Sequence, residues 1–119
     1  DAAIATKSLL AAADQFARRY GGVARASRFE DGRQTRRWAI CTGAGASSET
    51  IQEAETAGID TLIVGEGPHH TAVEAPERGL VIIYAGHYAT ETPGVSAVAR
   101  QMANEFGTSW VFIDAPTGL

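Results

Sequence analysis

Cysteine and net positive charge are both scarce in this sequence, and each shortage argues against a class of protein. Cys41 is the only cysteine in 119 residues, so the chain forms no intramolecular disulfide. A lone cysteine in an apolar run is usually a small buried side chain in a reducing environment, which predicts a cytoplasmic protein. Ten basic residues stand against 14 acidic ones, a formal net charge of −4, and this balance argues against nucleic acid as a partner.

Long apolar runs and familiar nucleophile motifs are absent as well. No stretch approaches the roughly 18 apolar residues of a membrane span, and no signal-peptide pattern is found, so we expect no membrane contact. There is no Gly-x-Ser-x-Gly sequence, and Cys41 lies inside a predicted strand. What remains is an ordinary globular composition, 45% hydrophobic and 20% charged, which suits one small domain over residues 1–119.

The spacing of apolar residues predicts an α/β fold, a helix-covered sheet of about five strands in the order α-β-β-α-β-α-β-α-β. The turn signal Glu30-Asp31-Gly32 predicts that the first two strands form a β-hairpin. Thr92 is expected to cap the last helix, because Pro93 suits the first helical position. Helices are expected over residues 4–20, 47–57, 70–78 and 92–106, and strands over residues 23–29, 36–42, 61–64, 80–85 and 110–113.

Polar residues of catalytic type lie in the turns that follow the predicted apolar strands, which is where open α/β sheets bind ligands. Three turns qualify, at residues 42–47, 65–70 and 86–91. All three histidines of the chain fall in the last two of these turns. The sequence therefore places its candidate chemistry at one end of the predicted sheet.

His87 and Glu91 are the candidate metal ligands. An imidazole nitrogen and a carboxylate oxygen both bind divalent ions, and a turn between a strand and a helix can point residues four apart at one spot. The alternative is that His87 simply ends the strand and Glu91 complements the positive end of the following helix. Spacing alone leaves both interpretations open.

Glu66, His69 and His70 are the candidate catalytic residues. Glu66 enters a glycine-flanked turn, where it would serve as a general base, as a partner that orients a metal ligand, or in an ordinary ion pair. His69 and His70 would share one ion only in an irregular turn, because neighbours on a helix point about 100° apart; otherwise they form the polar first turn of a helix. The glycine-rich turn at residues 43–47 would either cradle a phosphate or tightly connect a strand to a helix.

Four short segments also form a pattern in their order and spacing: Cys41-Thr42-Gly43-Ala44-Gly45, Gly65-Glu66, Gly86-His87-Tyr88-Ala89-Thr90-Glu91 and Phe112-Ile113-Asp114-Ala115-Pro116. Together they resemble the C-terminal half of the Nif-three-like family, whose bacterial members are often labelled GTP cyclohydrolase I type 2 homologues. The resemblance covers residues 36–119, and residues 1–35 match only loosely.

This resemblance implies a dinuclear metal centre in a cleft between two similar α/β halves, with His87 and Glu91 among the ligands. The metal would be zinc, manganese, iron or magnesium, with two ions per complete site. A ring-shaped hexamer and a nucleotide substrate such as GTP are implied too. The other family ligands, a His-His pair and an Asp, belong to an N-terminal half without a counterpart here. We therefore expect either a fragment or a half-length relative that holds part of the site.

Two functions are compatible with these observations. The first is a metal-dependent hydrolase module, in which Glu66 or a histidine moves protons. The second is a non-catalytic assembly or regulatory module with a partial or vestigial metal site, whose subunit contacts come from the predicted hairpin. A third arrangement, a mononuclear site made of His69, His70, His87 and Glu91, requires the turns after the third and fourth strands to be neighbours.

Overall fold

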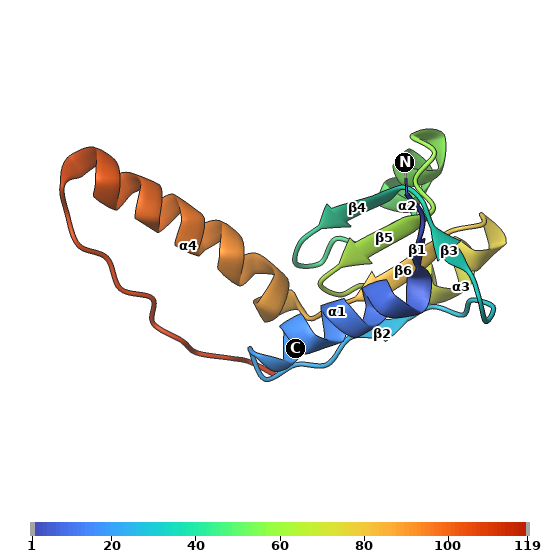
Figure 1. Cartoon of the computed structure of the whole chain (residues 1–119), viewed down its shortest axis with the longest axis horizontal. Helices are drawn as coiled ribbons and strands as arrows, with labels where there is room; N and C mark the ends of the chain where they lie inside the picture. The colour runs from blue at the N-terminus through green and yellow to red at the C-terminus, as the bar shows by residue number, and fades with distance from the viewer. Residues whose placement is uncertain (1, 119) are drawn as a thin grey trace.

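The computed structural model describes residues 2–118 and has the α/β architecture that the sequence predicts (Figure 1). The strands are β1 (Ile4–Ala5), β2 (Arg25–Ala26), β3 (Gln34–Thr35), β4 (Trp38–Cys41), β5 (Thr61–Val64) and β6 (Val81–Tyr84). Four of them form the main sheet in the order β2-β6-β5-β4, and β1 pairs with β3 in a small separate sheet. Strands β4, β5 and β6 run parallel, whereas β2 runs antiparallel to β6.

The two central strands are apolar on both faces, as strands of a covered parallel sheet usually are. In β5 and β6, alternate residues point to opposite faces and join separate cores. Leu62 and Val64 pack with Ile82 on one face, and Ile63 packs with Ile83 on the other. Burial on both sides explains why these strands read as continuous apolar runs in the sequence.

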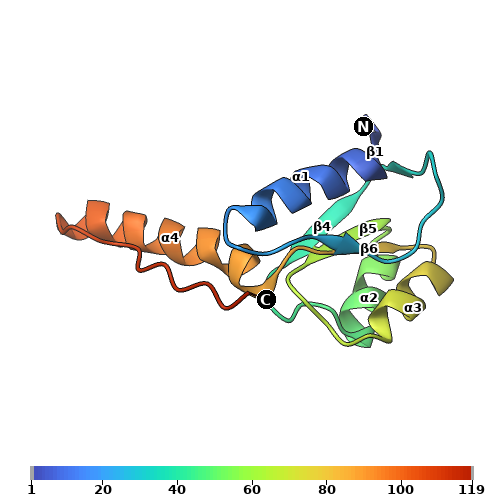
Figure 2. The same ribbon diagram turned by 90° about the horizontal axis from the view of Figure 1, so that it is seen from below.

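Helices cover the two faces of the sheet unequally (Figure 2). Helix α1 (Thr6–Arg18) lies on one face, and α2 (Ser48–Thr56) and α3 (Thr71–Glu77) lie on the other. Helix α4 (His87–Phe106) begins just after β6 and projects away from the sheet, which gives the molecule principal extents of 49 × 29 × 26 Å (Figure 1). Within residues 2–118, none of the helices has the length and apolar character needed to span a bilayer.

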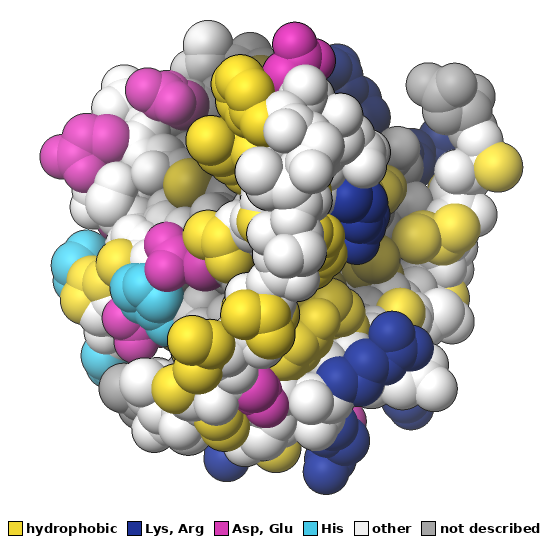
Figure 3. Space-filling view, turned by 90° about the vertical axis from the view of Figure 1, so that its left-hand side faces the viewer, with side chains coloured by type: hydrophobic (Ala, Val, Ile, Leu, Met, Phe, Trp, Pro, Cys, Tyr) yellow, Lys and Arg dark blue, Asp and Glu magenta, His cyan; other side chains and the backbone are white. Residues whose placement is uncertain are grey.

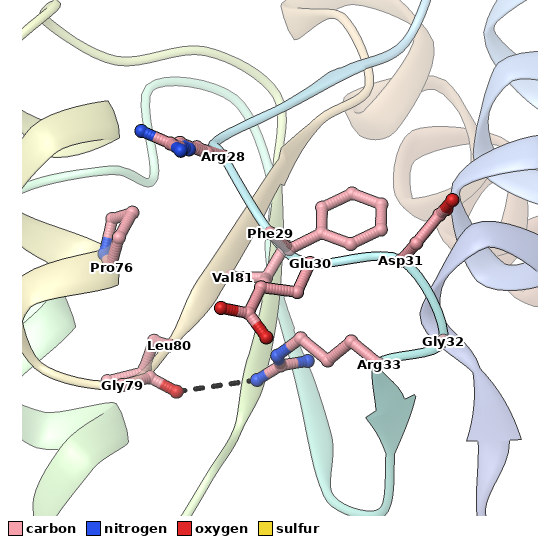
Figure 4. Close-up of a pocket in the computed structure, with 10 residues that line it drawn as sticks. All are labelled: Arg28, Phe29, Glu30, Asp31, Gly32, Arg33, Pro76, Gly79, Leu80 and Val81. Atoms are coloured by element: carbon pink, nitrogen blue, oxygen red, sulfur yellow. Dashed lines mark hydrogen bonds between the residues drawn. The ribbon is translucent and has the colours of Figure 1, made fainter.

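A chain of buried hydroxyl groups joins the small sheet to the amino-terminal end of the main sheet. The Thr6 and Thr35 hydroxyls are 2.9 Å apart, and those of Thr35 and Thr61 are 2.8 Å apart. The Arg33 guanidinium donates to the Thr61 hydroxyl at 3.1 Å and to the Gly79 carbonyl at 3.3 Å. Arg33 also lines a cavity of about 620 Å³ at this end of the sheet (Figure 4). These bonds fix the small sheet against the larger one.

The predicted hairpin between residues 23–29 and 36–42 is wrong. β2 pairs with β6, where Arg25 is opposite Tyr84, and β4 pairs with β5, where Trp38 is opposite Thr61. The physical reason is that β5 and β6 each need a hydrogen-bonding partner along both edges, and the two segments satisfy opposite edges. Between them, β3 is diverted into the small sheet with β1.

The predicted start of the last helix is also wrong. α4 begins at His87, and Pro93 lies inside it. Gly86, at φ +92°, makes a turn that a residue with a side chain rarely adopts, so the chain enters the helix directly after β6. Thr92 does not cap the helix; its hydroxyl donates to the Tyr88 carbonyl at 2.8 Å.

Two predictions about exposed segments are wrong as well. Residues 110–113 lie outside any strand that the structure describes, because α4 carries them away from the sheet edges (Figure 1). Cys41 is exposed rather than buried, because it ends β4, the edge strand of the main sheet. The α/β class is confirmed, and the sheet has four strands in its main part rather than about five.

Candidate metal centre

The candidate site lies where the parallel strands β4, β5 and β6 reach their carboxyl ends. Three backbone hydrogen bonds join the turns that follow them. The Glu66 N–H donates to the Gly43 carbonyl at 2.8 Å, the Ala46 N–H donates to the Glu66 carbonyl at 3.2 Å, and the Gly86 N–H donates to the Gly65 carbonyl at 2.9 Å. The turns therefore form one connected layer that holds the functional side chains.

His87 is held between two carboxylates. Its Nδ1 lies 2.7 Å from Glu66 Oε1, and its Nε2 lies 3.2 Å from Glu91 Oε2. An ionised carboxylate only accepts hydrogen bonds, so Nδ1–H donates to Glu66. Glu91 is four residues further along α4 and therefore lies on the same helix face as His87. The ring thus points its second nitrogen at the carboxylate that the sequence proposes as the other ligand.

The surroundings of His87 raise its pKa above the ordinary value of 6.5. The largest cause is the hydrogen bond to Glu66, with smaller contributions from the charges of Glu91 and Glu66; partial desolvation acts in the opposite direction. A proton on Nε2 and a metal ion on Nε2 are alternatives, because both use the same lone pair. Metal binding at His87 therefore competes with a proton that the two carboxylates favour.

Gly43 keeps the space beside the two candidate ligands open. A Cβ atom built on Gly43 would lie 2.6 Å from Glu91 Oε1 and 3.2 Å from His87 Nε2. Its φ of +63° also favours glycine. The Gly43 N–H donates to the Thr90 hydroxyl at 3.0 Å, which ties this turn to the first turns of α4. The residues present therefore fit a small ion beside His87 Nε2 and the Glu91 carboxylate.

The other predicted site residues are placed differently. Glu66 contacts the imidazole of His87 directly. His69 and His70 are exposed at the amino end of α3, on the side of the molecule where histidine and acidic side chains gather (Figure 3). Across residues 2–118 there is no group of three or more His, Cys, Asp or Glu side chains placed to hold a metal ion. The four-ligand mononuclear site is therefore not formed in this chain.

The glycine-rich turn at residues 43–47 is a tight connection. The Gly43 and Ala46 amides already donate within the chain, to Thr90 and to Glu66. Side chains on Gly45 or Gly65 would collide with the backbone of Cys41 or Gly43, respectively. The glycines let neighbouring turns approach one another, and these two amides are not free to bind a phosphate.

Sequence reasoning assigned no role to two residues that the structure links to the site. The Thr90 hydroxyl accepts from Gly43, as described, and Tyr88 connects α4 to the C-terminal tail, residues 108–118. The Tyr88 hydroxyl donates to Asp114 Oδ1 at 2.7 Å and accepts from the Ala115 N–H at 2.8 Å. This hydrogen bond to Asp114 raises the pKa of Tyr88. Both residues lie between His87 and Glu91 in the sequence, and this position within the candidate metal-binding segment is the signal by which they could have been found.

Comparison with known proteins agrees with the motif resemblance. The family described as Duf34/NIF3 (NGG1p interacting factor 3) matches residues 5–117. The chain belongs to the DUF34/NIF3 family. A Deinococcus radiodurans protein named "GTP cyclohydrolase 1 type 2 homolog" is 44% identical over 80 residues, which are 67% of this chain and 30% of the relative. A Halobacterium salinarum protein of the same name is 46% identical over 81 residues, 68% of this chain and 31% of the relative.

Solved structures in the family have the same fold. The protein ybgI, described as of unknown function, aligns with a TM-score of 0.81 at 28% identity, covering 99% of this chain and 46% of that one. TTHA1606 from Thermus thermophilus aligns with a TM-score of 0.74 at 32% identity, covering 99% of this chain and 45% of that one. The chain therefore spans about a third of the length of these curated relatives and under half of these solved chains.

Proposed function

We propose that His87 and Glu91 bind a divalent metal ion, and that this DUF34/NIF3 chain supplies part of a metal-dependent hydrolase acting on a nucleotide. The supporting observation is the placement of the His87 ring, with Nδ1 at 2.7 Å from Glu66 and Nε2 at 3.2 Å from Glu91. Metal-ligating histidines usually donate their other ring N–H to a carboxylate or carbonyl in this way. The relatives' names support a nucleotide as the substrate class.

One imidazole and one carboxylate suit zinc, manganese or iron, and the carboxylate also suits magnesium. When bound, such an ion lowers the pKa of a coordinated water and polarises the bond to be hydrolysed. The residues of this chain have separate tasks: Glu66 fixes the tautomer and direction of the His87 ring, and Gly43 leaves room at Nε2. Two donors are fewer than the four that zinc usually takes, so further groups complete the site. The family resemblance implies that the complete site would hold two ions.

Proton transfer is the second part of the proposal. Glu66 is occupied by the His87 ring and acts first as a positioning residue. His69 and His70 are exposed at the same end of the sheet and are not grouped with His87 and Glu91. Their proposed role is to exchange protons with a substrate bound over this end of the sheet.

The metal content of the purified chain tests the proposal. We expect bound divalent metal, measured by plasma mass spectrometry, to be lost in His87→Ala and retained in the control His70→Ala. Both changes remove an imidazole, but only His87 contacts Glu91. Metal content that is equal in the wild type and in His87→Ala contradicts the proposal.

The second candidate function is a non-catalytic assembly or regulatory module. It is favoured by the small number of metal donors that converge within the described chain and by the large apolar surface that it exposes. Its subunit contacts cannot come from the predicted hairpin, because the structure lacks that hairpin within residues 2–118. A stable oligomer that carries no metal favours this function over the hydrolase.

A further inference from the structure

The side chain of Thr90 lies where the turn after β4 meets the first turn of α4. Its hydroxyl accepts from the Gly43 N–H at 3.0 Å and donates to the His87 carbonyl at 3.2 Å. The Thr90 N–H donates to the Gly86 carbonyl at 3.0 Å, which fixes the backbone of this residue as well. Only 8% of Thr90 is exposed, so one small buried side chain joins two turns of the candidate metal centre.

Both hydrogen-bonding capacities of the Thr90 hydroxyl are used in this arrangement. A backbone N–H only donates and a carbonyl only accepts, so the hydroxyl must accept from Gly43 and donate to His87. Valine has the shape of threonine but can do neither, whereas serine can do both. The function of the hydroxyl can therefore be separated from that of the methyl group beside it.

Gly43 depends on this hydroxyl for the position of its amide. The Gly43 carbonyl accepts from the Glu66 N–H at 2.8 Å, and the Gly43 N–H has the Thr90 hydroxyl as its partner in a buried bond. A buried backbone N–H without a partner is costly, so native structures rarely contain one. Loss of the Thr90 hydroxyl should therefore make the turn shift towards another acceptor or admit water.

Thr90 cannot follow such a shift, because its other side is packed against the turn after β5. A Cβ atom built on Gly65 would lie 2.7 Å from Thr90 Oγ1. Gly65 is itself tied to the chain after β6, since its carbonyl accepts from the Gly86 N–H at 2.9 Å. The hydroxyl is thus a fixed point against which the Gly43 turn is placed.

The position of Gly43 decides how much space remains beside the candidate ligands. A Cβ atom built on Gly43 would lie 2.6 Å from Glu91 Oε1 and 3.2 Å from His87 Nε2. Zinc binds nitrogen and oxygen ligands at about 2.0–2.2 Å, and a well-formed site keeps these distances within about 0.2 Å. Even a small displacement of the Gly43 turn therefore changes whether an ion fits.

We propose that Thr90 is a positioning residue of the metal centre, and that its hydroxyl holds the Gly43 turn at the separation from His87 Nε2 and Glu91 that admits the ion. This inference rests on the proposed function, because it concerns the ion that these two side chains bind. Thr90 contacts the backbone of the turn rather than the ion, so it acts through Gly43.

Zinc affinity of the 119-residue chain, measured by calorimetric titration, tests the proposal. Removal of a group that orients a metal site typically weakens metal binding 10- to 100-fold. We expect Thr90→Val to weaken zinc binding by about tenfold and Thr90→Ser to restore it to within about twofold of the wild type.

Thr92→Val is the matched control. Thr92 is on the same helix, is 6% exposed, and its hydroxyl donates to the Tyr88 carbonyl at 2.8 Å. The control removes a similarly buried hydroxyl two residues away from Thr90, and the affinity for zinc should stay unchanged. An equal loss of affinity in Thr92→Val would overturn the proposal, because general weakening of α4 would then account for both variants.

Amide hydrogen exchange of the metal-free chain provides a measurement that does not involve the ion. The Gly43 N–H should exchange faster in Thr90→Val and at the wild-type rate in Thr90→Ser. Unchanged exchange at Gly43 in Thr90→Val overturns the proposal. A wild-type chain that binds no zinc overturns the proposed function together with this inference. Zinc that is lost in His87→Ala but bound equally by the wild type and Thr90→Val overturns the inference alone.

Discussion

At the residue scale, Gly43 combines a backbone requirement and a spatial one. Its φ of +63° favours glycine, and its missing side chain leaves room for Glu91 Oε1 and His87 Nε2. The two requirements can be separated with a glycine elsewhere in the chain. Gly107 has φ +62° and has no atom within 4 Å of a Cβ built on it.

Gly43→Ala should lower both stability and metal retention. The left-handed conformation alone should destabilise the fold by about 1–2 kcal/mol. The added methyl group also displaces the Glu91 carboxylate, so metal content should fall. Gly107→Ala should show a similar loss of stability by thermal denaturation, with no loss of metal. Equal metal retention in the two variants would separate Gly43 from the metal site.

Glu66→Gln should lower the pKa of His87 towards 6.5, because it removes the carboxylate whose hydrogen bond is the largest cause of the upward shift. A proton NMR titration of the metal-free chain measures this, with the exposed Glu77→Gln as the control. Folding raises the pKa of His87, so its protonation contributes stability that is fully present below pH 6.5 and is lost as the pH rises through the raised value. In Glu66→Gln, the pH at which this stability is lost should move down towards 6.5. An unchanged His87 titration would show that the Glu66 contact does not form in solution.

At the scale of elements, the sequence predicted the helices and strands that are specified by residues within the element itself. The helix expected over residues 47–57 forms as α2, and Ser47 caps it, because its hydroxyl accepts from the Thr50 N–H. The strand over residues 61–64 was found from its apolar run. The candidate ligand pair His87 and Glu91 could be selected from spacing and family resemblance, although its geometry depends on a helix start that was misplaced.

The failures concern pairings that depend on distant residues. Nothing local indicates that residues 25–26 pair with β6 rather than with the strand that follows them. The apolar residues 110–113 have strand composition, but a strand needs an edge to pair with, and α4 moves them away from both edges. The contact between Glu66 and His87 joins two turns 21 residues apart and required the sheet order to be known.

Thr35→Val should destabilise the junction between the two sheets. The Thr35 hydroxyl bridges those of Thr6 and Thr61 in a buried position, so the substitution removes one buried hydrogen bond from each of them. We expect a loss of about 1–3 kcal/mol in the free energy of unfolding, measured by urea denaturation. The control is Thr56→Val, at an exposed helix position, where the change should be within about 0.5 kcal/mol. Equal effects at the two positions would contradict a structural role for the hydroxyl chain.

At the scale of the whole molecule, the chain combines the proposed metal ligands His87 and Glu91 with a sheet whose two faces are covered unequally. Metal content and molecular mass separate the two candidate functions. Bound metal that is lost in His87→Ala supports the hydrolase module, whereas a stable oligomer without metal favours the assembly module. The membership in the DUF34/NIF3 family holds in either case.

The hydrogen bond between Tyr88 and Asp114 also decides how firmly the tail is attached to the rest of the chain. The two residues are 26 apart in the sequence, but α4 fills most of that interval, so the bond restrains only the short segment after Phe106. The bond is exposed to solvent, where water competes for both partners, and detachment of the tail is a local opening that leaves the sheet intact. Each release exposes the Ala115 amide to exchange with solvent deuterium, and the exchange rate reports how often the loop around α4 opens.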